Sequence, residues 1–135
     1  MEATASLNSI PMSVRKMRLV VDLIRNKPVG QALGILEYSK HEAAIWLRKN
    51  LLSAVANWEY KTDGMESADQ YGLVISEVFA DAGAQIKRFR PAPHGRAHRI
   101  RKHSCHITVK VRNTLPLPSE EAAVTANTPQ IVEEK

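Results

Sequence analysis

A stretch without any acidic residue runs from Ala82 to Ser119, and it holds nine lysines and arginines between Lys87 and Arg112. Cations packed this densely repel one another, and the commonest cellular counterpart for them is a phosphate backbone. Arginine outnumbers lysine in the central part, which suits bidentate contact with phosphate and stacking on exposed bases. We therefore predict nucleic-acid binding by Lys87, Arg88, Arg90, Arg96, Arg99, Arg101 and Lys102.

Four of the five histidines fall in the same stretch as the single cysteine: His94, His98, His103 and His106, with Cys105. A metal site is one chemistry that such a cluster could support. However, the spacing contains no Cys-x-x-Cys pair and matches no zinc-finger pattern. We predict no metal site and assign His94 and His103 to RNA contact. For Cys105 and His106, RNA contact and simple packing both stay open.

Catalysis has little support in the sequence. No Asp or Glu pairs with His or Ser in a recognisable motif, and there is no glycine-rich phosphate loop. A nuclease would need clustered carboxylates for Mg²⁺, and the basic stretch has none. We therefore predict that the chain is not an enzyme and needs no cofactor.

The basic stretch is expected to lie on a long β-hairpin. Leu73, Ile75 and Phe79 alternate with other residues as in a strand that is buried on much of both faces. A second alternating run, from Ile107 to Val111, follows the basic stretch. Pro91 to Gly95 supplies the turn, so residues of about 80–108 are predicted to form an antiparallel hairpin. Because so little of it is apolar, residues 86–101 should become ordered only against a partner.

Three amphipathic segments predict helices over residues 13–25, 29–38 and 42–61. The third has a continuous apolar stripe, whereas the first also carries a basic face that could grip RNA. A further strand is predicted over residues 5–10. The candidate RNA contacts on and after the first helix are Arg15, Lys16, Arg18 and Lys27.

The formal charge of +5 is distributed unevenly along the 135 residues. Residues 1–81 carry 9 basic and 10 acidic side chains, residues 82–112 carry 9 basic side chains alone, and residues 113–135 carry 1 basic and 4 acidic ones. We predict one RNA-binding domain over 1–112 and a disordered acidic tail over 113–135. The lone cysteine excludes an intrachain disulfide, and no secretory signal or spanning apolar run is visible, so a cytosolic location is expected.

Several motifs resemble those of the bacterial large-subunit ribosomal proteins of universal family twenty-two. The residues that carry the resemblance lie in the first helix, the second helix, the third helix and the hairpin. They are the runs 13–25, 31–36 and 53–59, then Lys87-Arg88, Pro91, Gly95-Arg96-Ala97, Ile100, Lys102 and His106 to Val109. The match covers about residues 8–112 in matching order.

The resemblance implies an α+β fold, with three helices packed on a small antiparallel sheet and a long protruding β-hairpin. It implies binding to large-subunit (23S) rRNA, a role in its assembly, and a hairpin tip that lines the nascent-peptide exit tunnel. It places Pro91 and Gly95 in the RNA-facing hairpin, together with the cations around them. The expected partners are therefore this rRNA, neighbouring ribosomal proteins and the nascent peptide, with no membrane and no homo-oligomer.

Some residues depart from the family pattern. Ala92-Pro93 stands where Arg-Ala is common, His103 replaces an arginine, and Cys105 replaces a small hydroxyl residue. Trp58 replaces an alanine, which implies local repacking. The alternative interpretation is a free-standing nucleic-acid-binding regulator that inserts its β-ribbon into a groove.

Overall fold

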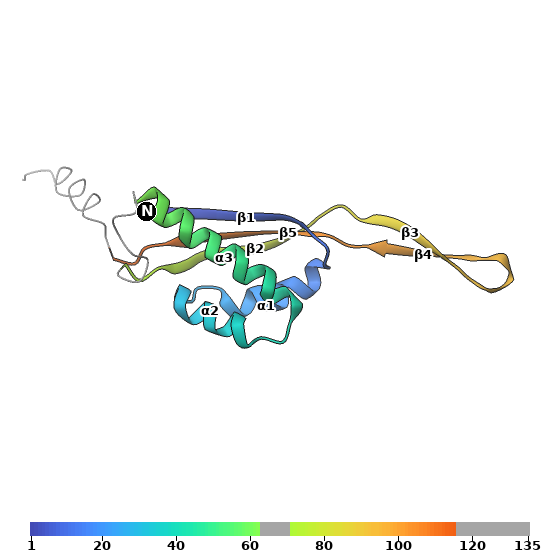
Figure 1. The fold of residues 1–135 in the computed structure, drawn as a ribbon, viewed down its shortest axis with the longest axis horizontal. Coiled ribbons are helices and arrows are strands. Elements are labelled where there is room, and N and C mark those ends of the chain that lie inside the picture. Colours follow the sequence, from blue (N-terminus) through green and yellow to red (C-terminus); the bar gives the residue numbers. More distant parts are fainter. Residues whose placement is uncertain (63–70, 116–135) are drawn as a thin grey trace, which may run out of the picture.

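The computed structural model describes residues 1–62 and 71–115, and it is an α+β fold with a long projecting hairpin (Figure 1). The elements follow in the order β1 (Glu2–Ile10), α1 (Val14–Ile24), α2 (Val29–Tyr38), α3 (Glu42–Lys61), β2 (Val74–Ala82), β3 (Ile86–Pro91), β4 (Ala97–Lys102) and β5 (Cys105–Arg112). The predicted fold class is confirmed, and so are the three helices. The predicted end of the third helix at Asp63-Gly64 lies outside the described residues.

The body is a three-stranded antiparallel sheet with the strand order β1-β5-β2. The last strand of the described residues, β5, therefore lies in the middle, between β1 and β2. Helix α3 packs on β1 and β5, and α1 packs on β2. Because β5 directly follows the hairpin and β2 directly precedes it, the central and one outer strand together form the base from which the hairpin extends (Figure 1).

The core lies between the helices and this sheet. Met17, Val21 and Ile24 of α1 are fully buried, as their spacing of three and four residues predicts. In α3, Leu47 and Trp58 are also completely buried. The ring of Trp58 lies 5.8 Å from that of Tyr71, measured between ring centroids, so the large side chain at this position is accommodated by aromatic packing.

Strand β2 departs from simple alternation. Its pairing with β5 shifts by one residue between Ile75 and Glu77, as in a β-bulge. Ile75 faces the core before the bulge, and Val78 and Ala80 face it afterwards, while Phe79 is 40% exposed. The expectation that Phe79 shares the buried face of Ile75, in a strand buried on both faces, is therefore wrong, because the bulge exchanges the two faces.

Strand β1 begins earlier than predicted and is an edge strand that α3 covers. The side chains of Asn50, Asn57 and Lys61 donate hydrogen bonds to backbone carbonyls of β1, at 3.4, 3.0 and 2.9 Å. Successive carbonyls of a strand point in opposite directions, so the contacts at Glu2 and Thr4 lie along one edge of β1 and the contact at Ala5 lies along the other. Polar residues of α3 therefore bind the backbone of β1, in addition to the packing of this helix on β1 and β5.

The two residues after Arg112 belong to the body. The hydroxyl of Thr114 donates to the carbonyl of Gly72 at 2.8 Å, and its backbone N–H donates to the carbonyl of Tyr71 at 3.2 Å. The amide of Asn113 donates to the carbonyl of Leu115 at 2.7 Å. Residues 113–115 therefore lie against the segment before β2, and residues 116–135, most of the predicted acidic tail, lie outside the described residues.

Candidate nucleic-acid interface

The hairpin leaves the body through a neck, which we define as residues 83–85 and 103–104. The N–H of Gly83 donates to the carbonyl of Ser104 at 2.8 Å, and the hydroxyl of Ser104 donates to the carbonyl of Ala84 at 2.6 Å. The outgoing side has one residue more than the returning side, because Ala82 pairs with Cys105 and Ile86 pairs with Lys102. The neck therefore contains an irregularity at the point where the sheet of the body ends.

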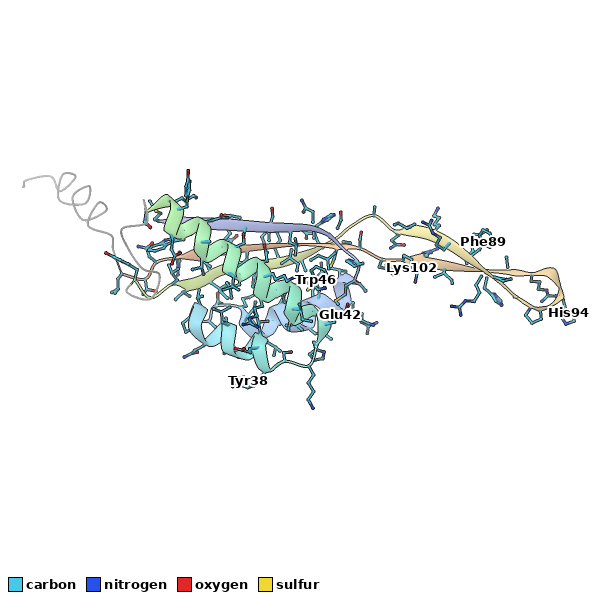
Figure 2. The ribbon with its side chains drawn as sticks, in the orientation of Figure 1. Tyr38, Glu42, Trp46, Phe89, His94 and Lys102 are labelled. Atoms are coloured by element: carbon cyan, nitrogen blue, oxygen red, sulfur yellow. The ribbon has the colours of Figure 1, made fainter. Side chains whose placement is uncertain are left out.

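Beyond the neck, β3 and β4 form a separate two-stranded sheet, here called the ribbon (residues 86–102). Opposite residues pair in register from Ile86 with Lys102 to Pro91 with Ala97. Figure 2 shows that the ribbon, drawn with its side chains, projects away from the helices. Six residues at about 3.3 Å each give each strand a length of roughly 20 Å. The hairpin predicted from the sequence is thus present, with antiparallel strands.

The cations of the ribbon lie on both of its faces. Directly opposite residues share a face, and neighbours along a strand alternate between faces. Applied to the observed register, this gives one face with Arg88, Arg90 and Lys102, and the other with Lys87, Arg99 and Arg101. Contact with phosphates on both sides of the ribbon is therefore geometrically possible, as the alternation predicts.

These cations have no acidic partner among the residues that the structure describes. Between residues in the described part of the chain, the ion pairs join Asp22 with Arg25, Glu37 with Arg48, and Glu77 with Lys110. None of them includes a cation of the ribbon, and the ribbon's lysines and arginines are all exposed. The ribbon therefore presents uncompensated positive charge to whatever surrounds it.

Lys110 differs from the other cations of the basic stretch. Its Nζ lies 2.6 Å from a carboxylate oxygen of Glu77 on the neighbouring strand. This hydrogen bond and the negative charge of Glu77 raise the pKa of Lys110. The basic stretch therefore does receive one compensating acid through the sheet, and Lys110 belongs to the body.

The turn of the ribbon is tight and depends on two residues with positive φ. His94 has a φ of 60° and Gly95 a φ of 70°, within a short 3₁₀ turn from Pro93 to Gly95. The N–H of Ala92 donates to the carbonyl of Arg96 at 2.8 Å and closes the turn. A Cβ on Gly95 would meet no atom within 4 Å, so its conformation alone, not space, favours glycine there.

The basic residues on and after α1 lie in two regions, one close to the neck and one near the start of β2. Arg18 donates two hydrogen bonds to the carbonyl of Ala80, from Nε at 3.2 Å and Nη2 at 3.1 Å, which ties it to β2 close to the neck. A guanidinium has five N–H donors, so this contact anchors Arg18 without using all of them. Arg15 and Lys16 are exposed on the same helix, whereas Lys27 is half-buried near the start of β2. The structure thus separates Lys27 from the neck.

The histidines and the cysteine have different surroundings. His94 and His103 are exposed, at the tip and at the neck. His106 accepts a hydrogen bond at Nδ1 from the N–H of Ser9, 3.1 Å away, and Ser9 has a φ of 58°. Cys105 is fully buried, and this burial raises the pKa of its thiol. Packing is therefore the role of Cys105, and His106 holds the irregular part of β1.

The role of His106 could not be predicted from the sequence, because Ser9 lies 97 residues away along the chain.

Over residues 1–62 and 71–115, no three His, Cys, Asp or Glu side chains are grouped as metal ligands. No helix in the same ranges is long and apolar enough to cross a membrane.

Comparison with known proteins identifies relatives over most of the chain. The family model described as ribosomal protein L22p/L17e matches residues 5–112. "Large ribosomal subunit protein uL22" of Bacteroides thetaiotaomicron is 50% identical over 107 residues, which is 79% of this chain and 77% of the relative. The protein of the same name from Flavobacterium johnsoniae is 51% identical with the same coverage. That of Cytophaga hutchinsonii is 47% identical over 122 residues, 89% of this chain and 65% of the relative.

Proposed function

Because the chain belongs to the ribosomal protein L22p/L17e family, we propose that it is a structural component of the large ribosomal subunit that binds 23S rRNA. It acts in the cytoplasm as part of that subunit, and its role is structural, not enzymatic. The observation that carries the RNA-binding role is the ribbon, which presents exposed cations on both faces and has no acidic partner within residues 1–62 and 71–115.

The mechanism is charge neutralisation. RNA helices that converge during assembly repel one another through their phosphates, and a slender ribbon of cations between them relieves this repulsion. Binding releases the counterions that the RNA had condensed, so the affinity falls as the salt concentration rises. Phosphate and sugar contacts dominate, and the protein therefore recognises the shape of the folded RNA and not a base sequence.

The interface comprises the ribbon, the neck and the basic end of α1. Arg18 supports the inclusion of α1, because its contact with Ala80 places this helix beside the base of the ribbon. Lys27 is the least favoured of the predicted contacts, since it is half-buried at the other end of β2. The proposed RNA-binding residues are Arg15, Lys16, Arg18, Lys27, Lys87, Arg88, Arg90, Pro91, His94, Gly95, Arg96, Arg99, Arg101, Lys102 and His103.

The tip of the ribbon is proposed to line the exit tunnel and to meet the nascent peptide. Two strands and a tight turn are narrow enough to pass between RNA helices, and the body is not. The other partners are neighbouring ribosomal proteins that contact the body. The chain enters the subunit as one copy and does not form a homo-oligomer.

Sedimentation tests the assignment to the large subunit. A tagged chain should migrate with large subunits on a gradient and stay with them in moderate salt. Recovery at the top of the gradient would instead support the alternative, a free-standing nucleic-acid-binding regulator. This alternative has no observation in its favour beyond the ribbon itself, which both functions would use.

A separate experiment tests the tunnel. A cysteine introduced by His94→Cys would carry a photo-crosslinker at the exposed tip, while the buried Cys105 would stay unlabelled. In ribosomes that hold a nascent chain, this tip should crosslink to the peptide once the chain is long enough to reach it. A crosslink to RNA alone, whatever the length of the nascent chain, would contradict the tunnel position. The same label on the distant α3 residue, introduced by Arg48→Cys, is the control.

A further inference from the structure

The ribbon carries one phenylalanine that is not part of the core. Phe89 of β3 is 78% exposed, and the ribbon has no second layer against which an aromatic ring could be buried. Figure 2 shows Phe89 on the ribbon, far from the labelled residues of α2 and α3. Charge neutralisation alone does not require an aromatic side chain at this place.

Three of the neighbours of Phe89 on its face of the ribbon are cations, and Pro91 and Ala97 form the next pair toward the tip. Arg99 lies directly opposite, and Lys87 and Arg101 occupy the next pair toward the neck. An open hollow of about 470 Å³ lies at this level of the ribbon, and residues of both faces line it: Lys87, Arg88, Phe89, Arg99, Ile100 and Arg101. The flat apolar ring of Phe89 therefore has groups that attract phosphate directly opposite it and on its neck side.

The opposite face uses its apolar residues differently. Ile100 is half-buried and lies next to Ile86 on that face, so these two aliphatic side chains can cover each other across the strands. In the described parts of the chain, the one cation–π contact joins Lys49 to Trp46, so no cation of the ribbon already covers the ring of Phe89. The ring is therefore available to a ligand.

We propose that Phe89 is a stacking platform for an unpaired nucleobase, with Lys87, Arg99 and Arg101 holding the adjacent phosphates. Aromatic rings bind single-stranded nucleic acid in this way with little sequence preference, because every base has a π-face. The ligand class is a single-stranded nucleotide within a folded RNA. This inference rests on the proposed RNA-binding function. It adds a site that binds unpaired bases and excludes paired ones.

The test compares substitutions that separate stacking from charge and from bulk. Phe89→Leu keeps the apolar volume and removes the aromatic plane, while Phe89→Tyr and Phe89→Trp keep a ring. The full-length variants are titrated with a 23S rRNA transcript from Bacteroides thetaiotaomicron over a series of salt concentrations. Ile45→Ala removes an exposed aliphatic side chain from α3, outside the proposed interface, and is the matched control.

Loss of one stacked base should weaken binding by roughly 5- to 150-fold in Phe89→Leu. The slope of log affinity against log salt should not change, because stacking releases no counterions. Arg99→Gln should instead make that slope shallower, reducing its magnitude by about 0.7 to 0.9. The Tyr and Trp variants should bind like the unmodified chain, as should Ile45→Ala. Equal affinities for Phe89→Leu and Phe89→Tyr would overturn the proposal, since bulk alone would then explain the residue.

A second probe separates this inference from the proposed function. The unmodified chain is titrated with a nine-residue oligoadenylate and with a ribose-phosphate chain of the same length that lacks bases. Stronger binding to the oligoadenylate, lost in Phe89→Leu, supports stacking. Binding to rRNA without any preference between the two probes would reject stacking and leave the proposed function standing. Failure to bind rRNA at all would reject both.

Discussion

Gly83 and Ser104 approach so closely across the neck that a Cβ built on Gly83 would lie 2.5 Å from the Ser104 hydroxyl oxygen. It would also lie 3.0 Å from Nε2 of His106 and 3.2 Å from the carbonyl carbon of Ser104. The neck therefore has no room for a side chain at position 83, and its hydrogen bonds depend on this closeness.

Gly83→Ala should destabilise the protein by roughly 1–3 kcal/mol, because the Ser104 hydroxyl must move and lose its bond to Ala84. Urea unfolding followed by circular dichroism measures the change. Gly34→Ala in α2 is the control, since a Cβ there meets nothing within 4 Å, and alanine should stabilise the helix by about 0.5–1 kcal/mol. Equal stabilities for the two variants would show that the neck tolerates a side chain.

Arg88→Ala and Arg96→Ala should each weaken binding to large-subunit rRNA. Each should also reduce the magnitude of the slope of log affinity against log salt by about 0.7 to 0.9, as expected for the loss of one phosphate contact. Filter binding at several salt concentrations measures both quantities. Arg48→Ala is the matched control, because Arg48 is exposed on α3 and pairs with Glu37. If all three slopes remain equal to that of the unmodified chain, the ribbon does not bind phosphate.

Backbone amides of the ribbon should exchange with solvent much faster in the free protein than those of β5. The ribbon is a two-stranded sheet with exposed residues on both faces, and such hairpins are marginally stable in water. Hydrogen exchange read by NMR measures this, and addition of rRNA should slow exchange over residues 86–101. Uniform strong protection of these amides in the free protein would mean that the ribbon needs no partner to be ordered.

The buried thiol of Cys105 should make stability fall as the pH rises above about 8.5, the ordinary thiol pKa. Because burial raises the pKa of Cys105, the unfolded chain loses its thiol proton at lower pH than the folded chain does, and alkaline conditions favour unfolding. The stability contributed by Lys110 is retained until the pH rises toward its own raised pKa, above about 10.4.

Denaturation between pH 7.5 and 10 therefore isolates the effect of the thiol. The fall in stability should be smaller in Cys105→Ala, and a thiol reagent should react with the folded protein much more slowly than with the unfolded chain. Identical pH profiles for the two chains would contradict the assignment of this effect to Cys105.

Local patterns predict most of the elements, because helices and strands follow the spacing of apolar residues. The bounds of α2 and α3 agree with the sequence prediction, and the antiparallel hairpin follows from two alternating runs around a Pro/Gly turn. The charge on both faces of the ribbon also follows, since alternation along a strand is a property of its backbone.

Features that depend on distant residues were not predictable in this way. The bulge at Ile75 exposes Phe79, although the alternation alone places both residues on one face. The bond from Ser9 to His106 and the cover of β1 by Asn57 join segments that are 97 and 53 residues apart. The same holds for the compensation of Lys110 by Glu77, which only the pairing of β2 with β5 produces.

The central claim is that the ribbon lies against the phosphates of folded 23S rRNA. A density map of the large ribosomal subunit that contains this chain tests it most directly. The claim predicts that the guanidinium groups of Arg88, Arg96 and Arg99 lie within hydrogen-bonding distance of phosphate oxygens, with RNA along both faces of the ribbon. A ribbon that projects into solvent, or that is enclosed by protein alone, would contradict it.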